Sequence, residues 1–220
     1  MIDINKILKE KLLNAPVTEH SIKECEKAIV MELAKHISNI LEHLTEELRS
    51  DKEIVLAAVT REGSNLGYVC DELKTDREVV LAAVNSEGMA LMELTEEYKA
   101  DREVVFKAVN NNGSALAYAS AEFKSDQEIV LIAVEKCGFA YKFASELLRN
   151  DKAFTLTAVK QNGLALGYVS DEFKMDRDIV MAAVQQNGLA LEDADEIFRR
   201  DEEIVNAAIA NNPEASVFAW

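Results

Sequence analysis

The chain has almost no proline, and its glycine is confined to a few places. Pro16 and Pro213 are the only prolines among 220 residues, and six of the eight glycines recur at one fixed spacing. Flexible linkers and low-complexity tracts are usually rich in these residues or in serine. The composition therefore indicates no disordered linker.

Cysteine and long apolar runs are scarce as well. Cys25, Cys70 and Cys137 are the only cysteines and form no CxxC pair, which is typical of reduced thiols in a cytosolic compartment. The start, MIDINKILKEKLL, is charged and lacks the apolar centre of a secretory signal. No apolar run approaches the ~20 residues that span a bilayer. We therefore expect a cytoplasmic protein without a membrane segment.

Basic residues are outnumbered by acidic ones, 24 to 40, which gives a formal net charge of −16. An acidic chain repels phosphate backbones, so we expect neither nucleic acid nor an anionic membrane as a partner. Two interpretations of the excess stay open. It keeps the protein in solution, or it forms a surface that receives a basic protein or peptide.

What the sequence does contain is a 25-residue repeat without insertions. DKEIVLAAVTREGSNLGYVCDELKT (51–75) is followed by DREVVLAAVNSEGMALMELTEEYKA (76–100), and the pattern continues toward the end. A fixed period of this size indicates a stacked-repeat architecture. The units open with Asp51, Asp76, Asp101, Asp126, Asp151, Asp176 and Asp201, and they share the glycines Gly63, Gly88, Gly113, Gly138, Gly163 and Gly188.

The first half of each unit predicts a short helix. Its aspartate is a good N-cap, because a carboxylate accepts hydrogen bonds from the free amides of the first turn. Apolar residues follow at helical spacing, as in Ile54, Val55, Ala58 and Val59. The glycine comes after the last of them, where a left-handed C-cap belongs. We expect this helix to cover about nine residues.

A second, shorter helix is expected from the residue after the glycine to the next aspartate. In 151–175 its apolar stripe is Ala165, Leu166, Val169 and Phe173. Helices this short are marginal alone in water, so neighbouring units must cover one another's apolar faces. The sequence thus predicts an all-α fold, a right- or left-twisted α-solenoid of short two-helix repeats with a 25-residue period.

The expected organisation is a single continuous domain. Residues 51–220 supply seven tandem repeats, the last incomplete, and residues 1–50 form an N-terminal helical cap. The apolar end at Trp220 has two interpretations, a short cap or a cut from a longer chain.

The cap includes a degenerate repeat at 26–50, which keeps the register with Ser38 in place of the glycine. Without that glycine, its two helices are expected to run on as one. Residues 3–14 are expected to form a further amphipathic helix that ends at the turn of Asn14, Ala15 and Pro16.

The recurring phrase D-x-E-I/V-V-x-x-A-V-x-x-x-G-x-A-L-x-x-A/V-x-x-E-F/L-K/R resembles the family called domain of unknown function 4116. The resemblance covers residues 51–220 and, weakly, 26–50. It implies an α-helical repeat protein of a kind found mainly in bacteria and protists. It implies no activity, because the family has no assigned chemistry. Leu147 and Ile197 depart from the pattern, since other units have an acid at that place.

Catalytic residues are nearly absent from the pattern. His20, His36 and His43 are the only histidines, and all precede the regular repeats. Cys70 and Cys137 therefore have no histidine inside the repeats to act as a base. No metal-binding, phosphate-binding or nucleophile motif occurs. We therefore expect that the protein is not an enzyme and that it has no cofactor and no metal site. A pocket that brings histidine, cysteine and carboxylate side chains together would contradict this expectation.

Two rows of side chains are candidate partner-binding residues. An aromatic residue recurs at one place in four units, where other units have Glu93 and Asp193, so the place is at least partly exposed. A basic residue follows the opening aspartate in most units. The candidates are Tyr68, Tyr118, Phe143 and Tyr168 in the aromatic row, and Arg77, Arg102 and Arg177 in the basic row. Structural alternatives stay open, namely the edge of the core for the aromatics and local ion pairing for the arginines.

These patterns favour a protein–protein interaction scaffold, because a constant frame carries variable surface residues and no catalytic set. The alternative is an acidic inhibitor or immunity-type protein that occludes a basic partner. An enzyme is the least favoured hypothesis.

Overall fold

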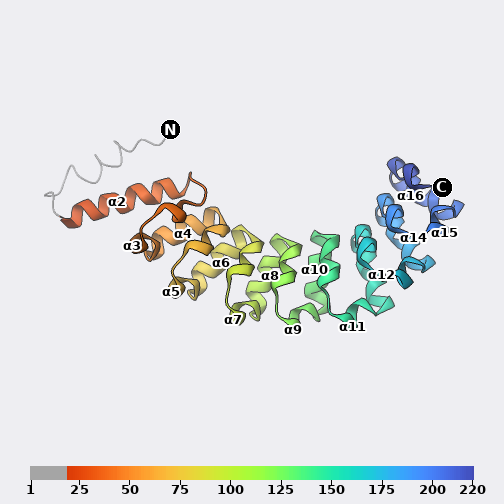
Figure 1. Ribbon diagram of the computed structural model, residues 1–220, viewed down its shortest axis with the longest axis horizontal. Coiled ribbons are helices and arrows are strands. Elements are labelled where there is room, and N and C mark those ends of the chain that lie inside the picture. Colours follow the sequence, from red (N-terminus) through yellow and green to blue (C-terminus); the bar gives the residue numbers. More distant parts are fainter. Residues whose placement is uncertain (1–18) are drawn as a thin grey trace. The chain divides into compact units, whose positions relative to one another are not determined.

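The computed structural model describes residues 19–220, so the helix and turn expected over residues 3–16 lie outside the described residues. The chain divides into two compact units, Met1–Thr95 and Glu96–Trp220. All regular secondary structure within residues 19–220 is helical, as predicted (Figure 1). The protein is an all-α solenoid, and whether it forms one continuous domain stays a prediction.

Each complete 25-residue repeat contains three helical segments rather than two. In 151–175, α12 (Lys152–Gln161) is a ten-residue α-helix, η6 (Gly163–Tyr168) is a 3₁₀ helix, and α13 (Asp171–Lys174) is a single α-helical turn. Val169 and Ser170 between η6 and α13 are extended, with ψ of 166° and 156°. The prediction of one continuous second helix was therefore wrong.

The apolar spacing of this segment fits a continuous helix equally well, so it did not reveal the break. Ala165, Leu166, Val169 and Phe173 are all buried, as predicted. The available signal was the residue before each short helix, which is a serine, threonine or aspartate in six repeats and so of an N-cap type. These residues are Thr45, Thr95, Ser120, Ser145, Ser170 and Asp195.

The seven opening aspartates occupy the N-cap position of the long helices. The Asp51 carboxylate accepts hydrogen bonds from the amides of Glu53 and Ile54, and the Asp101 carboxylate accepts one from Val104. The other five bond in the same way as Asp51, and they are Asp76, Asp126, Asp151, Asp176 and Asp201. Each long helix is thus fixed at its first turn.

The prediction that the glycines are left-handed C-caps was wrong. No glycine among the described residues has a positive φ, and Asn162, which ends α12, is extended. Glycine is required because the next repeat comes too close for a side chain. A Cβ on Gly163 would lie 2.4 Å from the Ala183 carbonyl oxygen. None of the six repeat glycines is left-handed; they are Gly63, Gly88, Gly113, Gly138, Gly163 and Gly188.

Unit 1 begins with the degenerate repeat, which does not form one long helix as expected. Helix α2 ends at Ala34, and Asn39 then takes a left-handed conformation with φ of 50°. The Asn39 amide donates a hydrogen bond to Glu62 Oε2 of the next repeat at 3.2 Å, which holds this turn. The described elements of unit 1 are α2 (Glu19–Ala34), η1 (Ile40–His43), α3 (Glu46–Arg49), α4 (Lys52–Arg61), η2 (Gly63–Tyr68), α5 (Asp71–Lys74), α6 (Arg77–Ser86) and η3 (Gly88–Glu93).

Unit 2 carries the most regular part of the array. Besides α12, η6 and α13, its elements are α7 (Glu96–Lys99), α8 (Arg102–Asn111), η4 (Gly113–Tyr118), α9 (Ala121–Lys124), α10 (Gln127–Lys136), η5 (Gly138–Phe143), α11 (Glu146–Arg149), α14 (Arg177–Gln186), η7 (Gly188–Asp193), α15 (Glu196–Arg199), α16 (Glu202–Asn211) and η8 (Pro213–Phe218).

Successive repeats within a unit stack element on element. The long helices α8, α10, α12, α14 and α16 pack in order, and the 3₁₀ helices η4 to η8 form a second row (Figure 1). A typical long helix buries Ile54, Val55, Ala58 and Val59 completely, and each larger apolar side chain contributes about 1.5–3 kcal/mol. The remaining faces of the segments carry the candidate surfaces.

Candidate interaction surfaces

The predicted aromatic row lies at the ends of the 3₁₀ helices. Tyr68, Tyr118, Phe143 and Tyr168 are the last residues of η2, η4, η5 and η6. Tyr168 is exposed, and the other three are half-buried. The row therefore lies at the rim of the core, where each ring packs on one side and reaches the surface on the other.

Two members of the row come together in unit 2. Phe139, the second residue of η5, lies between Phe143 and Tyr168, and its ring centroid is 5.2 Å and 5.1 Å from theirs, edge-on in both cases. Lys142 Nζ lies 3.7 Å from the centroid of Phe139. We call Phe139, Lys142, Phe143 and Tyr168 the aromatic cluster. It joins two neighbouring repeats.

Phe139 was not singled out from the sequence. The same repeat position carries Ser64 and Ser114, but also Leu164 and Leu189. Leu164 is 42% exposed, so an apolar residue here is not required by the core. Three successive repeats have an apolar residue at this position, where serine suffices in others. That pattern was the signal that could have identified Phe139.

The remaining tyrosines of the row are separate from the cluster. The Tyr68 hydroxyl donates a hydrogen bond to Glu42 Oε2 of the preceding repeat at 3.1 Å, and this bond raises the pKa of Tyr68. Within the described chain, Tyr118 makes no contact with another aromatic ring. The row is thus not a continuous aromatic stripe.

Asp193 takes the aromatic position in the repeat after Tyr168. Its carboxylate packs against Gly167, where an added Cβ would lie 2.8 Å from Asp193 Oδ2. Burial raises the pKa of the Asp193 carboxyl group. Gly167, which precedes Tyr168, therefore lies against the half-buried carboxyl group of Asp193.

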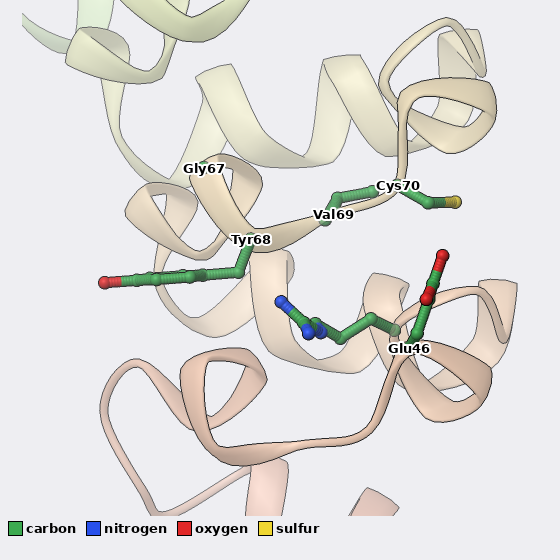
Figure 2. Close-up of a pocket in the computed structure, with 6 residues that line it drawn as sticks. Glu46, Gly67, Tyr68, Val69 and Cys70 are labelled. Carbon is green, nitrogen blue, oxygen red and sulfur yellow. The ribbon is translucent and has the colours of Figure 1, made fainter.

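Unit 1 contains a cavity of about 310 Å³ between α3 and the end of η2 (Figure 2). Gly67 faces open space, because nothing lies within 4 Å of a Cβ built there. In Figure 2 the Cys70 sulfur and the Glu46 carboxylate lie at one end and the Tyr68 ring at the other. The lining includes a cysteine and a carboxylate but no histidine. The cavity is lined by Glu46, Arg49, Gly67, Tyr68, Val69 and Cys70.

The basic row forms a ladder between repeats. Lys52 Nζ lies 2.8 Å from Asp76 Oδ2 and 2.9 Å from Glu78 Oε2, so one cation bridges the N-cap aspartate and the following acid of the next repeat. The hydrogen bond from Lys52 lowers the pKa of Asp76. We call each such cation with its two acids a rung. Further rungs start from Lys27, Arg102, Lys152 and Arg177.

Two of the three candidate arginines belong to rungs. Arg102 and Arg177 are engaged with carboxylates of the following repeat, which favours ion pairing over a free binding ridge. Arg77 occupies the same position at the start of α6. The rung from Lys27 also places the degenerate repeat in register with the rest.

The two histidines whose side chains the structure describes, His36 and His43, lie on different segments. His36 follows α2, with Nε2 3.4 Å from Glu32 Oε1, whereas His43 belongs to η1. The side chains of His20 and Cys25 lie outside the described part of the chain. Among the described residues, no histidine, cysteine and acid side chains are grouped to hold a metal ion. Over the same residues, no helix combines the length and the apolar character that a membrane crossing needs.

Comparison with known families gives four tandem matches to one model. That model is described as a domain of unknown function, DUF4116, and it matches residues 27–74, 76–124, 126–174 and 176–219. The chain belongs to the DUF4116 family. Each DUF4116 match spans two 25-residue repeats, and the first begins within the degenerate repeat. No curated protein and no solved structure matches the chain.

Proposed function

We propose that this DUF4116 protein is a protein–protein interaction scaffold and that it binds its partner through the aromatic cluster. The observation that supports this most directly is the contact of Phe139, Phe143 and Tyr168 across two repeats at the rim of the core. Aromatic side chains are enriched at protein interfaces because they offer large, rigid contact area. The backbone that carries these three side chains is already fixed by the stacking of the repeats. Binding therefore costs little additional conformational entropy.

The chemistry of the partner follows from charge. With a net charge of −16, the scaffold attracts a basic partner over distances up to about a Debye length. Many acids of the long helices are engaged in rungs, but the short helices carry exposed acids such as Asp71, Glu122 and Asp171. These exposed acids equally favour the second candidate function, an inhibitor that occludes a basic enzyme.

The test uses variants that the repeat itself shows to be tolerated. Phe139→Ser with Tyr168→Glu places at the cluster the residues found at the same repeat positions in Ser64 and Glu93. Tyr118→Glu is the matched control, because it makes the same change at an aromatic residue outside the cluster. Wild type and variants are immobilised, proteins are captured from lysate of the source organism, and recovery is quantified by mass spectrometry.

We expect at least one protein to bind wild type and Tyr118→Glu equally and to be lost from the cluster variant. Removal of an interface hot spot costs about 2 kcal/mol or more, which corresponds to roughly a 30-fold loss of affinity. If every captured protein binds the cluster variant as well as wild type, the proposal is wrong. Steep weakening with salt and inhibition of the captured enzyme would favour the inhibitor instead.

A further inference from the structure

The ladder of rungs has one gap in unit 2. At the junction of α10 and α12, the position of the cation is occupied by Gln127 and the position of the second acid by Ala153. Both members of the rung are thus replaced at the same junction. Asp151 remains, because it is still needed as the N-cap of α12, where its Oδ1 accepts hydrogen bonds from Ala153 and Phe154 at 2.8 and 3.1 Å.

The carboxylate of Asp151 is left without a cation. It forms no ion pair with any residue in 19–220, and its Oδ2 accepts no hydrogen bond there. The neighbouring cations are engaged elsewhere, since Lys152 bridges Asp176 at 2.6 Å and Arg149 Nε donates a hydrogen bond to the Ala144 carbonyl oxygen at 3.1 Å. Nothing in this part of the chain therefore neutralises Asp151.

The same junction is packed differently from its neighbours. A Cβ added to Gly113 or Gly163 would meet the carbonyl oxygen of the alanine twenty residues on, whereas one added to Gly138 would meet Ala165 N at 2.8 Å. The core also changes here, because the Tyr141 hydroxyl lies 2.8 Å from Thr155 Oγ1, a buried polar contact. The two repeats meet with an offset at this point.

A cavity of about 180 Å³ lies beside the uncovered carboxylate. It is smaller than the ~300–1,000 Å³ of typical small-molecule sites, so it suits a single side chain. Leu131 and the ring of Phe154 supply apolar wall, and Asp151 and Gln127 supply hydrogen-bond acceptors. The lining residues are Gln127, Leu131, Asp151, Ala153, Phe154 and Thr157.

We propose that this cavity receives an arginine side chain of a protein partner, which completes the rung that the chain itself leaves out. The inference rests on the proposed interaction function and names the group that the partner presents. The internal repeats show the mode of binding, since Arg102 and Arg177 cover the equivalent aspartates in the same way. Arginine suits the site because its planar fork can bond the Asp151 carboxylate and the Gln127 carbonyl together, while its stem lies on the apolar wall.

The probe is acetyl-arginine-amide, added to the ¹⁵N-labelled full chain and followed by backbone and side-chain amide NMR shifts. We expect saturable shifts at the amides of 151–154 and at the Gln127 side chain. Acetyl-citrulline-amide, which has the same shape without the charge, should cause none.

Two variants test the role of the uncovered carboxylate. Asp151→Asn removes the charge but keeps a good N-cap, so the helix should form as before. Gln127→Arg supplies the rung from within the chain. Both should abolish the arginine shifts, and thermal unfolding of each variant verifies its fold.

The inference is overturned if wild type shows no saturable shift, if Asp151→Asn responds like wild type, or if the amides around Asp176, whose rung is complete, respond equally. In the capture experiment, Gln127→Arg should lower recovery of the partner. If the probe binds but recovery is unchanged, the arginine does not come from that partner. Phe139→Ser with Tyr168→Glu should leave the arginine shifts intact, so the failure of either proposal can be read separately.

Discussion

Replacement of Gly163 by alanine tests whether the repeat glycines serve packing rather than backbone conformation. The added Cβ would lie 2.4 Å from the Ala183 carbonyl oxygen, 1.0 Å inside the 3.4 Å at which ordinary contact begins. That oxygen also accepts the hydrogen bond of the Asn187 amide at 2.8 Å, so it cannot move away freely. The junction of α12 and α14 must open to admit one methyl group.

The expected cost follows from two opposing effects. Overpacking a tight interior costs about 1–3 kcal/mol, and the upper part of this range applies because the contacted atom is backbone. Alanine also reduces the conformational entropy of the unfolded chain, which stabilises the folded state by about 0.4–1 kcal/mol. The net loss is about 2 kcal/mol, or a fall in Tm of roughly 4–8 °C for a chain of this size.

Gly67→Ala is the matched control, because nothing lies within 4 Å of its added Cβ. It should be neutral or stabilised by up to about 1 kcal/mol, since only the unfolded-state effect applies. Tm is measured for both variants by circular dichroism at 222 nm under identical conditions, because repeat arrays can unfold piecewise and extrapolated free energies are less secure. If Gly163→Ala and Gly67→Ala unfold at the same temperature, the close approach does not explain the glycines.

Two further predictions concern polar groups between repeats. Tyr141→Phe should cost about 0.5–1.5 kcal/mol in urea unfolding, because the Tyr141 hydroxyl lies 2.8 Å from the buried Thr155 Oγ1, which keeps its own hydrogen bond to the Asp151 carbonyl oxygen. Thr155→Val should then cost less in the Tyr141→Phe background than in wild type, and equal costs would contradict the hydrogen bond between the two hydroxyls. The pKa of Asp76 is lowered by the hydrogen bond from Lys52, so its charged form stabilises the fold above about pH 4, and this contribution is lost as the pH falls through the lowered value. Asp76→Asn should therefore lose stability less steeply than wild type below about pH 4 in thermal unfolding, and parallel curves would refute the assignment.

Much of the surface was visible in the sequence as a set of positions, but not as a set of contacts. The aromatic row was predicted, yet the cluster depends on Phe139, which belongs to a different repeat position. The arginines were predicted as neighbours on one ridge, yet their carboxylate partners lie 24 and 26 residues further on. The sequence shows that Gln127 replaces the basic residue of other repeats. Its consequence could be inferred only from the structure, which shows that this basic residue pairs with the N-cap aspartate of the next repeat.

The periodic placement of aspartate, apolar residues and glycine by itself determined a helical repeat that stacks on its own copies, because N-caps and apolar spacing act within a single turn or helix. Only the tertiary structure decided how each repeat folds back on itself and why its glycine is needed. Val169 and Phe173 satisfy a helical period whether or not the chain breaks between them, and Gly163 is required by the Ala183 carbonyl group of the next repeat. The glycine contact joins segments twenty residues apart, and the local pattern carries no record of it, whereas the only local sign of the break is the N-cap type of the residue before the short helix, here Ser170.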